Sequence, residues 1–169
     1  MGKYGFVLGL AAIVVFADQV TKWMVVAWIP LHAVIEIIPG FAELTHVKNT
    51  GGAFGFLAGA PDSWRLPFFL GASLVAIVLL WQVVRHTGAD ERGVLFAVGS
   101  ILGGAVGNLI DRAREGAVTD FISLHWREYY WPAFNVADSF ISIGVAVLVW
   151  QSLWSGRAGS AGKAAASEH

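Results

Sequence analysis

Two aspartates, Asp120 and Asp138, have the residue type and the surroundings best suited to chemistry in this sequence. Asp120 lies in the segment Val-Thr-Asp-Phe at 118–121, and Asp138 lies at the start of a long apolar run. Carboxylates at the edge of a membrane segment are costly to bury, so they are candidates for function by default. Two of them facing each other would form an acid–base pair able to hydrolyse a peptide bond.

The composition indicates a membrane protein. Of the 169 residues, 56% are hydrophobic and 14% are charged, and the mean hydropathy is +0.64. Soluble domains have about 45–50% apolar and about 25% charged residues. Eight tryptophans suit an aromatic belt at a membrane interface. The net charge of -1 gives no sign of nucleic-acid binding, and the absence of cysteine excludes disulfides, a thiol nucleophile and cysteine metal ligands.

Four segments are long and apolar enough to cross a bilayer, which takes about 20 residues. They predict an all-α polytopic membrane protein with one domain over residues 1–154. No small-x-small cleavage signal follows the first segment, so we expect it to stay as a span. A tail rich in Ala, Gly and Ser, residues 155–169, is predicted to be disordered. The predicted spans are residues 4–28, 66–84, 94–110 and 134–153.

The connections between the spans differ in length and character. Residues 34–38 and 41–47 flank a Pro39-Gly40 turn, which predicts a small β-hairpin outside the membrane. The connection 111–132 is also long, and its aromatic residues suit the membrane interface, so we expect an interfacial loop there. The connection 85–93 is short and polar, which makes the second and third spans a helical hairpin.

The order of the spans gathers the polar residues at one face. Because consecutive spans alternate in direction, the end of the first, the end of the third and the start of the fourth meet at the same membrane face. Both long connections open on that face as well. The residues concerned are Asp18, Lys22, Asn108, Asp111, Arg112, Asn135 and Asp138.

Positive charge does not decide which face is cytoplasmic, because five Lys and Arg lie on the side of the termini and six on the other. The first set is Lys3, Arg85, Arg92, Arg157 and Lys163, and the second is Lys22, Lys48, Arg65, Arg112, Arg114 and Arg127.

Each polar cluster also has a purely structural interpretation. Asp18 and Lys22 have the i,i+4 spacing of a helical ion pair. Asn135 could cap the fourth helix, and Asp120 alone could be an ordinary loop residue. Taken together, these structural interpretations are less convincing, because capping and pairing do not explain why so many residues that are unfavourable to bury lie at one membrane face. Local capping and ion pairing could also account for the end of the third span, with Asn108, Asp111 and Arg112.

Glycines on the third span predict close helix packing. Gly104 lies beside a small-xxx-small row, and such rows let membrane helices approach closely. We expect this approach to bring the fourth span, with Asp138, against Asn108 and Asp111. Ordinary packing without catalytic meaning is the plainer interpretation of these glycines. The row consists of Gly99, Gly103 and Gly107.

Other chemistries find less support. The five histidines are scattered, and the sequence has no His-Glu-x-x-His metal motif, no Gly-x-Ser-x-Gly elbow and no phosphate loop. An ion-coupled transporter would also place Asp, Asn and Lys in membrane helices, but its polar residues should trace a path through the bilayer. A non-catalytic scaffold could use the glycine and aromatic surfaces for partners, but would not need two separated aspartates.

Five ordered motifs give the sequence a specific resemblance. It resembles lipoprotein signal peptidase, the bacterial signal peptidase II family of aspartic endopeptidases, over residues 18–143. No motif position departs from the family pattern. The motifs are Asp-Gln-Val-Thr-Lys (18–22), Asn-Thr-Gly-Gly-Ala-Phe (49–54), Gly-Gly-Ala-Val-Gly-Asn-Leu-Ile-Asp-Arg (103–112), Val-Thr-Asp-Phe (118–121) and Phe-Asn-Val-Ala-Asp (134–138).

The resemblance implies a defined activity. Family members remove signal peptides from prolipoproteins in the bacterial inner membrane, cutting just before a cysteine that carries diacylglyceryl. It implies a catalytic pair, Asp120 and Asp138, and no metal or cofactor. It also implies cytoplasmic termini, a site at the periplasmic surface with the hairpin as a β-cradle, and contact with membrane phospholipid by a monomer. The supporting residues that it implies are Asp18, Lys22, Asn49, Gly104, Asn108, Asp111, Arg112, Asn135 and Ala137.

Overall fold

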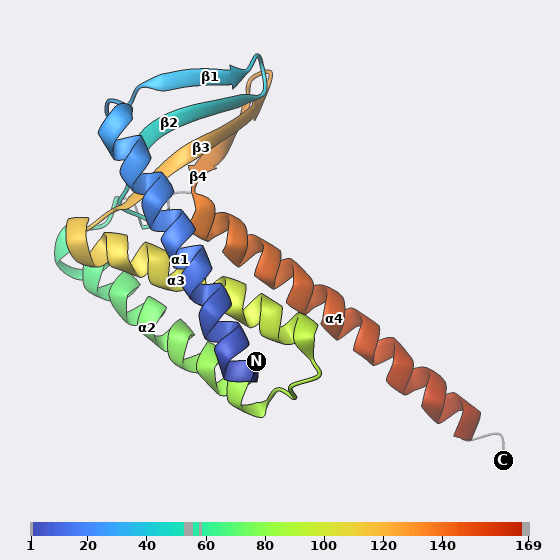
Figure 1. Cartoon of the computed structure of the whole chain (residues 1–169). Helices are drawn as coiled ribbons and strands as arrows, with labels where there is room; N and C mark the ends of the chain where they lie inside the picture. The colour runs from blue at the N-terminus through green and yellow to red at the C-terminus, as the bar shows by residue number, and fades with distance from the viewer. Residues whose placement is uncertain (1, 53–55, 58, 167–169) are drawn as a thin grey trace.

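Four long helices and a four-stranded antiparallel sheet form the described part of the protein (Figure 1). The computed structural model describes residues 2–52, 56, 57 and 59–166, and the side chains of residue 62 and of 155–166 lie outside this description. The elements are α1 (Lys3–Trp28), β1 (Val34–Ile38), β2 (Ala42–Asn49), α2 (Asp62–His86), α3 (Arg92–Glu115), β3 (Val118–Trp126), β4 (Tyr129–Phe134) and α4 (Val136–Ala166).

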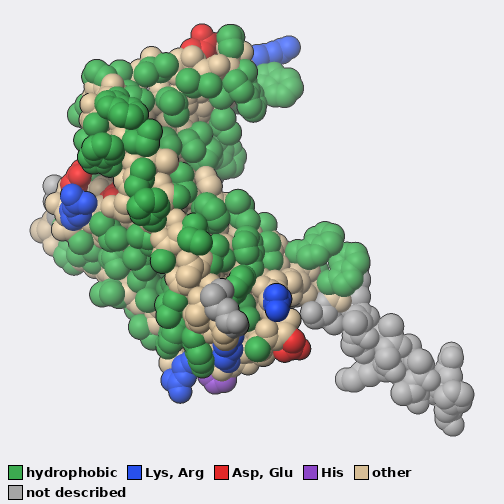
Figure 2. Space-filling view, in the orientation of Figure 1, with side chains coloured by type: hydrophobic (Ala, Val, Ile, Leu, Met, Phe, Trp, Pro, Cys, Tyr) green, Lys and Arg blue, Asp and Glu red, His purple; other side chains and the backbone are tan. Residues whose placement is uncertain are grey.

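The helices have the length and surface of membrane spans. Within the described residues, four segments are long and apolar enough to cross a bilayer: Lys3–Trp28, Ser63–His86, Arg92–Glu115 and Val136–Trp154. Their outward faces carry exposed large apolar side chains, among them Phe16, Leu79 and Trp150. Hydrophobic side chains cover most of the face seen in Figure 2, and the charged ones form small groups at its top, its left edge and its bottom. Exposure of so much apolar surface is unfavourable in water, whereas it is favourable in lipid. The predicted polytopic membrane fold is confirmed.

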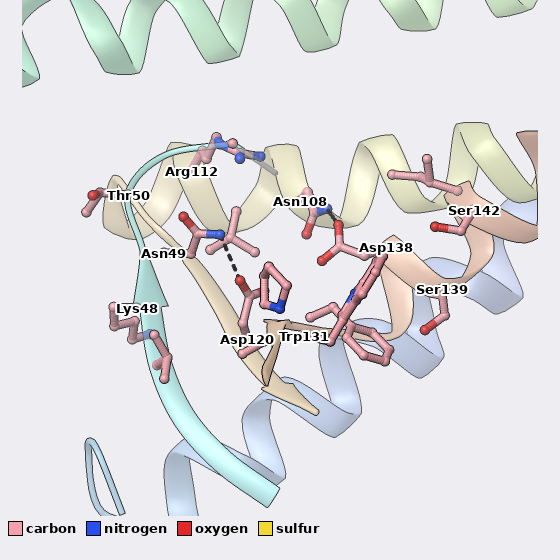
Figure 3. A pocket seen from close by; sticks show the side chains of 17 residues that line it. Lys48, Asn49, Thr50, Asn108, Arg112, Asp120, Trp131, Asp138, Ser139 and Ser142 are labelled. Carbon is pink, nitrogen blue, oxygen red and sulfur yellow. Dashed lines mark hydrogen bonds between the residues drawn. The ribbon is translucent and has the colours of Figure 1, made fainter. Parts of the chain in front are cut away.

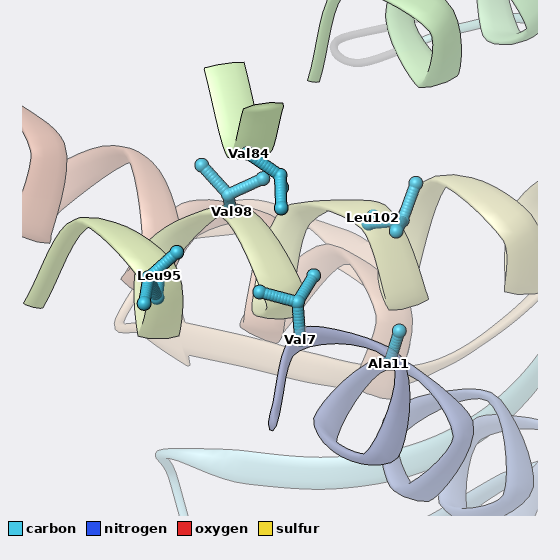
Figure 4. Packing of buried hydrophobic residues seen from close by; sticks show 6 residues of the cluster. All are labelled: Val7, Ala11, Val84, Leu95, Val98 and Leu102. Carbon is cyan, nitrogen blue, oxygen red and sulfur yellow. The ribbon is translucent and has the colours of Figure 1, made fainter. Parts of the chain in front are cut away.

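Helix α3 is the centre of the helical part, because α1, α2 and α4 all pack against it. At the end away from the sheet, the buried apolar core joins three helices (Figure 4). Its residues are Val7 and Ala11 from α1, Val84 from α2, and Leu95, Val98 and Leu102 from α3. The core therefore holds the bundle together at one end and leaves the other end for polar groups.

The glycines of α3 face two different helices. A Cβ atom at Gly103 would lie 2.8 Å from the backbone oxygen of Ala11 on α1, and one at Gly104 would lie 2.5 Å from that of Ala137 on α4. Gly99 also faces α1. The predicted close approach is thus real, but the glycine row packs mainly on α1, and Gly104 makes the close contact with α4. The reason is that successive helical residues point about 100° apart, so adjacent glycines serve different neighbours.

The sheet is larger than the predicted hairpin. Its strand order is β1-β2-β3-β4, and every neighbouring pair is antiparallel. The hairpin of β1 and β2 is confirmed, whereas the loop expected over 111–132 is wrong. That segment continues α3 to Glu115 and then forms β3 and the start of β4. Pairing with β2 satisfies the backbone groups of β3, which a loop of that length would leave to water.

The fourth helix begins two residues later than the start of the predicted span and ends well beyond its end. Asn135 precedes the first helical residue, Val136, and the helix runs to Ala166. The sequence predicts disorder from Ser155, and the high helix propensity of the alanines there favours the helical backbone instead. The cytoplasmic position of this tail stays a prediction.

Candidate active site

A cavity of about 670 Å³ lies where the sheet meets the helices, and both aspartates line it (Figure 3). The cavity takes residues from β2, β3, β4, α3 and α4. Around the two carboxylates stand Asn49 on β2, Asn108 and Arg112 on α3, and Trp131 on β4. Segments far apart in the sequence therefore contribute to one cavity, as the alternation of the spans predicts.

Asp138 occupies the first turn of α4. Its backbone N–H donates to Oδ1 of Asn135 (2.9 Å), and its own Oδ2 accepts from the backbone N–H of Asn135 (3.3 Å). This reciprocal pair is a capping box, so the predicted capping role of Asn135 is confirmed. The other carboxylate oxygen, Oδ1, accepts a hydrogen bond of 2.8 Å from Nδ2 of Asn108. The carboxylate is thus held by local helix geometry on one side and by α3 on the other.

Asp120 is held by the sheet and is almost fully buried, at 2% exposure. It lies on β3 opposite Val47 of β2. Its Oδ2 accepts from Nδ2 of Asn49 (2.9 Å), and its Oδ1 accepts from Nδ2 of Asn135 (2.7 Å). Burial raises the pKa of Asp120 to about 6, and the nearby charge of Asp138 acts in the same direction. The two amide hydrogen bonds act against this rise in pKa, because they stabilise the ionised form.

Asn135 links the two aspartates. It donates from Nδ2 to Asp120, and its backbone N–H and Oδ1 complete the capping box with Asp138. The same Nδ2 also lies 3.3 Å from Oδ1 of Asn108. Asn135 is completely buried. A single neutral side chain therefore sets the relative placement of two carboxylates without adding a charge.

Lys22 is the buried cation behind this arrangement, and its side chain is 5% exposed. Its ammonium group lies 2.8 Å from Oδ2 of Asp18 and 2.9 Å from Oδ2 of Asp111. The third contact is a hydrogen bond of 3.0 Å to Oδ1 of Asn108. All three donors of the ammonium group are therefore used. The predicted pair of Asp18 and Lys22 exists, but Asp111 shares the same cation, which the i,i+4 spacing does not reveal.

The acceptors of Lys22 are themselves held by other elements. Oδ1 of Asp18 accepts from the backbone N–H of Ala137 on α4 (2.9 Å), and Oδ2 of Asp111 accepts from that of Thr119 on β3 (3.1 Å). Gln19 donates to Oδ1 of Asp111 (2.9 Å). Gln19 is absent from the predicted site residues, although it stands beside Asp18 in the first motif. The network therefore ties α1, α3, α4 and β3 together beneath the cavity.

The structure brings all the predicted site residues to this end of the protein, in three roles. Eight form the hydrogen-bonded centre, and Arg112 donates from Nη2 to the backbone oxygen of Gly51 (3.0 Å). Gly104, Ala137 and the backbone of Gly107 let the helices approach at the edge of the centre. Within the described residues, no three His, Asp or Glu side chains gather where they could hold a metal ion. The centre consists of Asp18, Lys22, Asn49, Asn108, Asp111, Asp120, Asn135 and Asp138, of which Asp120 is the member supplied by β3.

Comparison with known proteins identifies the family. The sequence profile of signal peptidase (SPase) II matches residues 10–154. The chain belongs to the signal peptidase II family. It is 44% identical over 149 residues to the lipoprotein signal peptidase of Syntrophotalea carbinolica, covering 88% of this chain and 91% of that protein. It is 47% identical over 144 residues to the lipoprotein signal peptidase of Nitratidesulfovibrio vulgaris, covering 84% and 86%.

Solved structures agree with this membership. A bacterial membrane enzyme superposes with a TM-score of 0.82 at 31% identity, covering 90% of each chain. A second one has a TM-score of 0.79 at 30% identity, covering 88% of this chain and 93% of the other. The resemblance inferred from the five motifs is therefore confirmed, and so is the membrane fold of this signal peptidase II family member.

The shared cation gives a stability prediction. Lys22→Met should lower the free energy of unfolding by about 3–5 kcal/mol, because it leaves two buried carboxylates unpaired. The triple change Lys22→Met, Asp18→Asn, Asp111→Asn should recover most of that loss. Thermal unfolding in detergent micelles measures both. Equal unfolding temperatures for the single and triple variants would contradict a charge network centred on Lys22.

The donors to Asp120 give a pKa prediction. Asn49→Ala removes a hydrogen bond that stabilises the ionised carboxylate, so the pKa of Asp120 should rise above about 6. A hydrogen bond to a charged group is worth about 1.5–3 kcal/mol, which corresponds to about one to two pKa units. NMR titration of the Asp120 carboxyl carbon in detergent micelles measures the shift. Gln82→Ala, which removes an exposed amide on α2, is the control and should leave the titration unchanged.

Proposed function

We propose that this protein is an aspartic endopeptidase that removes signal peptides from prolipoproteins, with Asp120 and Asp138 as its catalytic pair. The observation that carries the proposal is that both carboxylates line one cavity and are bridged by Asn135. The curated relatives are named lipoprotein signal peptidases. The polar residues gather at one end of the bundle, while the other end is an apolar core. That distribution suits a surface site better than a transport path.

The proton inventory of the pair follows from its charges. Two carboxylates that interact closely do not both ionise easily, so the pair shares one proton and titrates as a unit. The raised pKa of Asp120, about 6, is of the kind that keeps a proton available near neutral pH. Asn49, Asn108 and Asn135 orient the pair through amide groups, which bring no competing charge.

Peptide hydrolysis then needs one water molecule between the carboxylates and the scissile bond. The ionised carboxylate takes a proton from the water, whose oxygen attacks the carbonyl carbon. The protonated carboxyl group donates its proton to the carbonyl oxygen, which gives a neutral tetrahedral diol. Collapse of the diol breaks the C–N bond: the protonated carboxyl group donates its proton to the leaving amine, while the ionised carboxylate takes a proton from one hydroxyl group of the diol, which becomes the carboxyl group of the product. The pair ends with one shared proton, as it began.

The substrate that we propose is a precursor with a diacylglyceryl-modified cysteine, cut just before that cysteine. This follows the family resemblance, and the placement of the cavity supports it. The cavity lies where the membrane helices meet the sheet, so an acyl chain can stay in the bilayer while the peptide reaches the carboxylates. Each buried CH₂ group stabilises by about 0.8 kcal/mol, so two acyl chains fix the depth of the substrate.

The proposed location is the bacterial inner membrane, with both termini in the cytoplasm and the sheet on the periplasmic side. Both ends of the chain and the turn between α2 and α3 lie away from the sheet in Figure 1. The sheet and cavity would then face the compartment in which lipoproteins mature. A monomer as the working unit is part of this proposal.

The catalytic roles are tested by removing one carboxylate at a time. Asp120→Asn and Asp138→Asn should each reduce cleavage of a diacylglyceryl-modified precursor by at least about 10²–10⁴-fold, because each removes a proton-transfer group. The double variant should be little slower than either single variant, since the two groups act as a unit. The control is Asp90→Asn, an exposed aspartate between α2 and α3, which should cleave normally. Substantial activity in either single variant would remove that residue from the pair.

The proposed substrate is tested by comparing two forms of one precursor in the same membrane. At equal concentration, the unmodified form should be cleaved at least about tenfold more slowly, because it lacks the acyl chains that position the cysteine. Gel-shift assays of purified protein in lipid vesicles measure both rates. Equal rates would show that lipid recognition is no part of the specificity.

A further inference from the structure

The aromatic ring of Phe69 on α2 lies outside the cavity and contacts Arg112, which lines it. Among the described residues that line the cavity, none belongs to α2. Phe69 nevertheless lies against Arg112, whose guanidinium carbon is 4.7 Å from the centre of the ring. This is the geometry of a cation–π contact, for which the range extends to about 6 Å. Phe69 thus connects the peripheral helix α2 to the edge of the candidate active site.

The ring also borders the loop that follows β2. A Cβ atom at Gly52 would lie 3.1 Å from Cε1 of Phe69, so the backbone of Gly52 approaches the ring edge closely. Nη2 of Arg112 donates to the backbone oxygen of the preceding Gly51 (3.0 Å). The two glycines therefore lie beside the stacked pair, Gly52 against the ring and Gly51 bonded to the guanidinium group. A larger residue at position 52 would have to displace the ring.

This loop fixes the orientation of Asn49. The backbone N–H of Gly51 donates to Oδ1 of Asn49 (3.0 Å). With its oxygen occupied, the Asn49 amide presents Nδ2 to Asp120, where it donates a hydrogen bond of 2.9 Å. A reversed amide would set two oxygens against each other, so the Gly51 contact selects the productive orientation. The position of Gly51 in turn depends on Arg112.

Arg112 is placed with several carboxylates near it. The negative charges of Asp138, Asp120 and Asp111 attract its guanidinium group. Its Nε is buried without a hydrogen-bond partner among the described residues, while Nη2 is used on Gly51. The face of Phe69 offers the guanidinium group a site away from the carboxylates. Without the ring, the attraction of the carboxylates would favour a different position for the guanidinium group.

We propose that Phe69 is a positioning residue for the catalytic pair, acting through Arg112 and the Gly51-Gly52 backbone on Asn49 and so on Asp120. The inference rests on the proposed function, because it assigns Phe69 a part in the same site. The ring holds the guanidinium group, the guanidinium group holds the loop, and the loop orients the amide that donates to the buried carboxylate. Phe69 contacts neither carboxylate, so it affects where the carboxylates lie and takes no part in proton transfer.

Variants at position 69 separate the aromatic face from simple packing. Phe69→Leu and Phe69→Met keep an apolar side chain but remove the ring, and we expect kcat to fall about tenfold with KM within about twofold. Phe69→Tyr keeps the ring and should restore near-normal kcat. The matched control is Phe16→Leu, on an exposed phenylalanine of α1, which should cleave normally. The assay uses the full chain in lipid vesicles with a diacylglyceryl-modified precursor. Normal kcat for Phe69→Met, or no restoration by Phe69→Tyr, would overturn the proposal.

A double-mutant cycle with Asn49→Ala tests the route. If Phe69 acts through Asn49, adding Phe69→Leu to Asn49→Ala should reduce kcat by less than about twofold further. Full additivity of the two changes would overturn the proposal.

A measurement without substrate separates this proposal from the proposed function. The side-chain amide resonances of Asn49 in micelles should shift or broaden in Phe69→Leu and Phe69→Met and stay unchanged in Phe16→Leu. Unchanged resonances in all variants would overturn the positioning role. If the wild-type protein cleaves no prolipoprotein but the Phe69 variants still show the expected resonance changes, the proposed function alone is overturned.

Discussion

The structure of the site depends on one buried positive charge. An isolated ammonium group beside a bilayer is strongly unfavourable, and Lys22 is tolerated because two carboxylates and an amide oxygen surround it. Those acceptors come from α1 and α3, and they also bind backbone N–H groups of α4 and β3. Removal of the charge would therefore disturb four elements at once. The contact with Asn108 has a further effect, because it occupies Oδ1 and directs Nδ2 to Asp138.

Neutral amides surround the two aspartates. Asn108, Asn135 and Asn49 each use an oxygen on one partner and a nitrogen on a carboxylate. An amide has distinct donor and acceptor ends, so fixing one end fixes the other. Charged side chains in these three places would change the protonation of the two aspartates. Asparagines orient the two carboxylates and leave the net charge unchanged. This explains in physical terms why asparagine is the residue type that surrounds the two aspartates.

Much of this could be predicted from the sequence, because hydrophobic length and alternating direction are local signals. They place the four helices and bring Asp18, Asn108 and Asp138 to one face. The strands β3 and β4 were missed, since aromatic residues such as Trp126 and Tyr129 suit a membrane interface as well as a strand. The contact between Lys22 and Asp111 could not be predicted either, because i,i+4 spacing describes one helix and says nothing about contacts between helices. Pairing of distant segments is a tertiary property, and local patterns do not encode it.

Helix α3 is the scaffold on which both carboxylates depend. Asn108, Asp111 and Arg112 lie at i, i+3 and i+4, so they occupy one side of a single turn of α3. Asn108 reaches Asp138 on α4, Asp111 holds Lys22 and the start of β3, and Arg112 holds the loop that orients Asn49. The distance between α3 and its neighbours is set by glycines that leave no room for a Cβ atom. A rotation of α3 by one residue, about 100°, would move all three side chains away from their partners together. The two carboxylates are thus placed by one rigid helical turn, although they belong to a strand and a different helix.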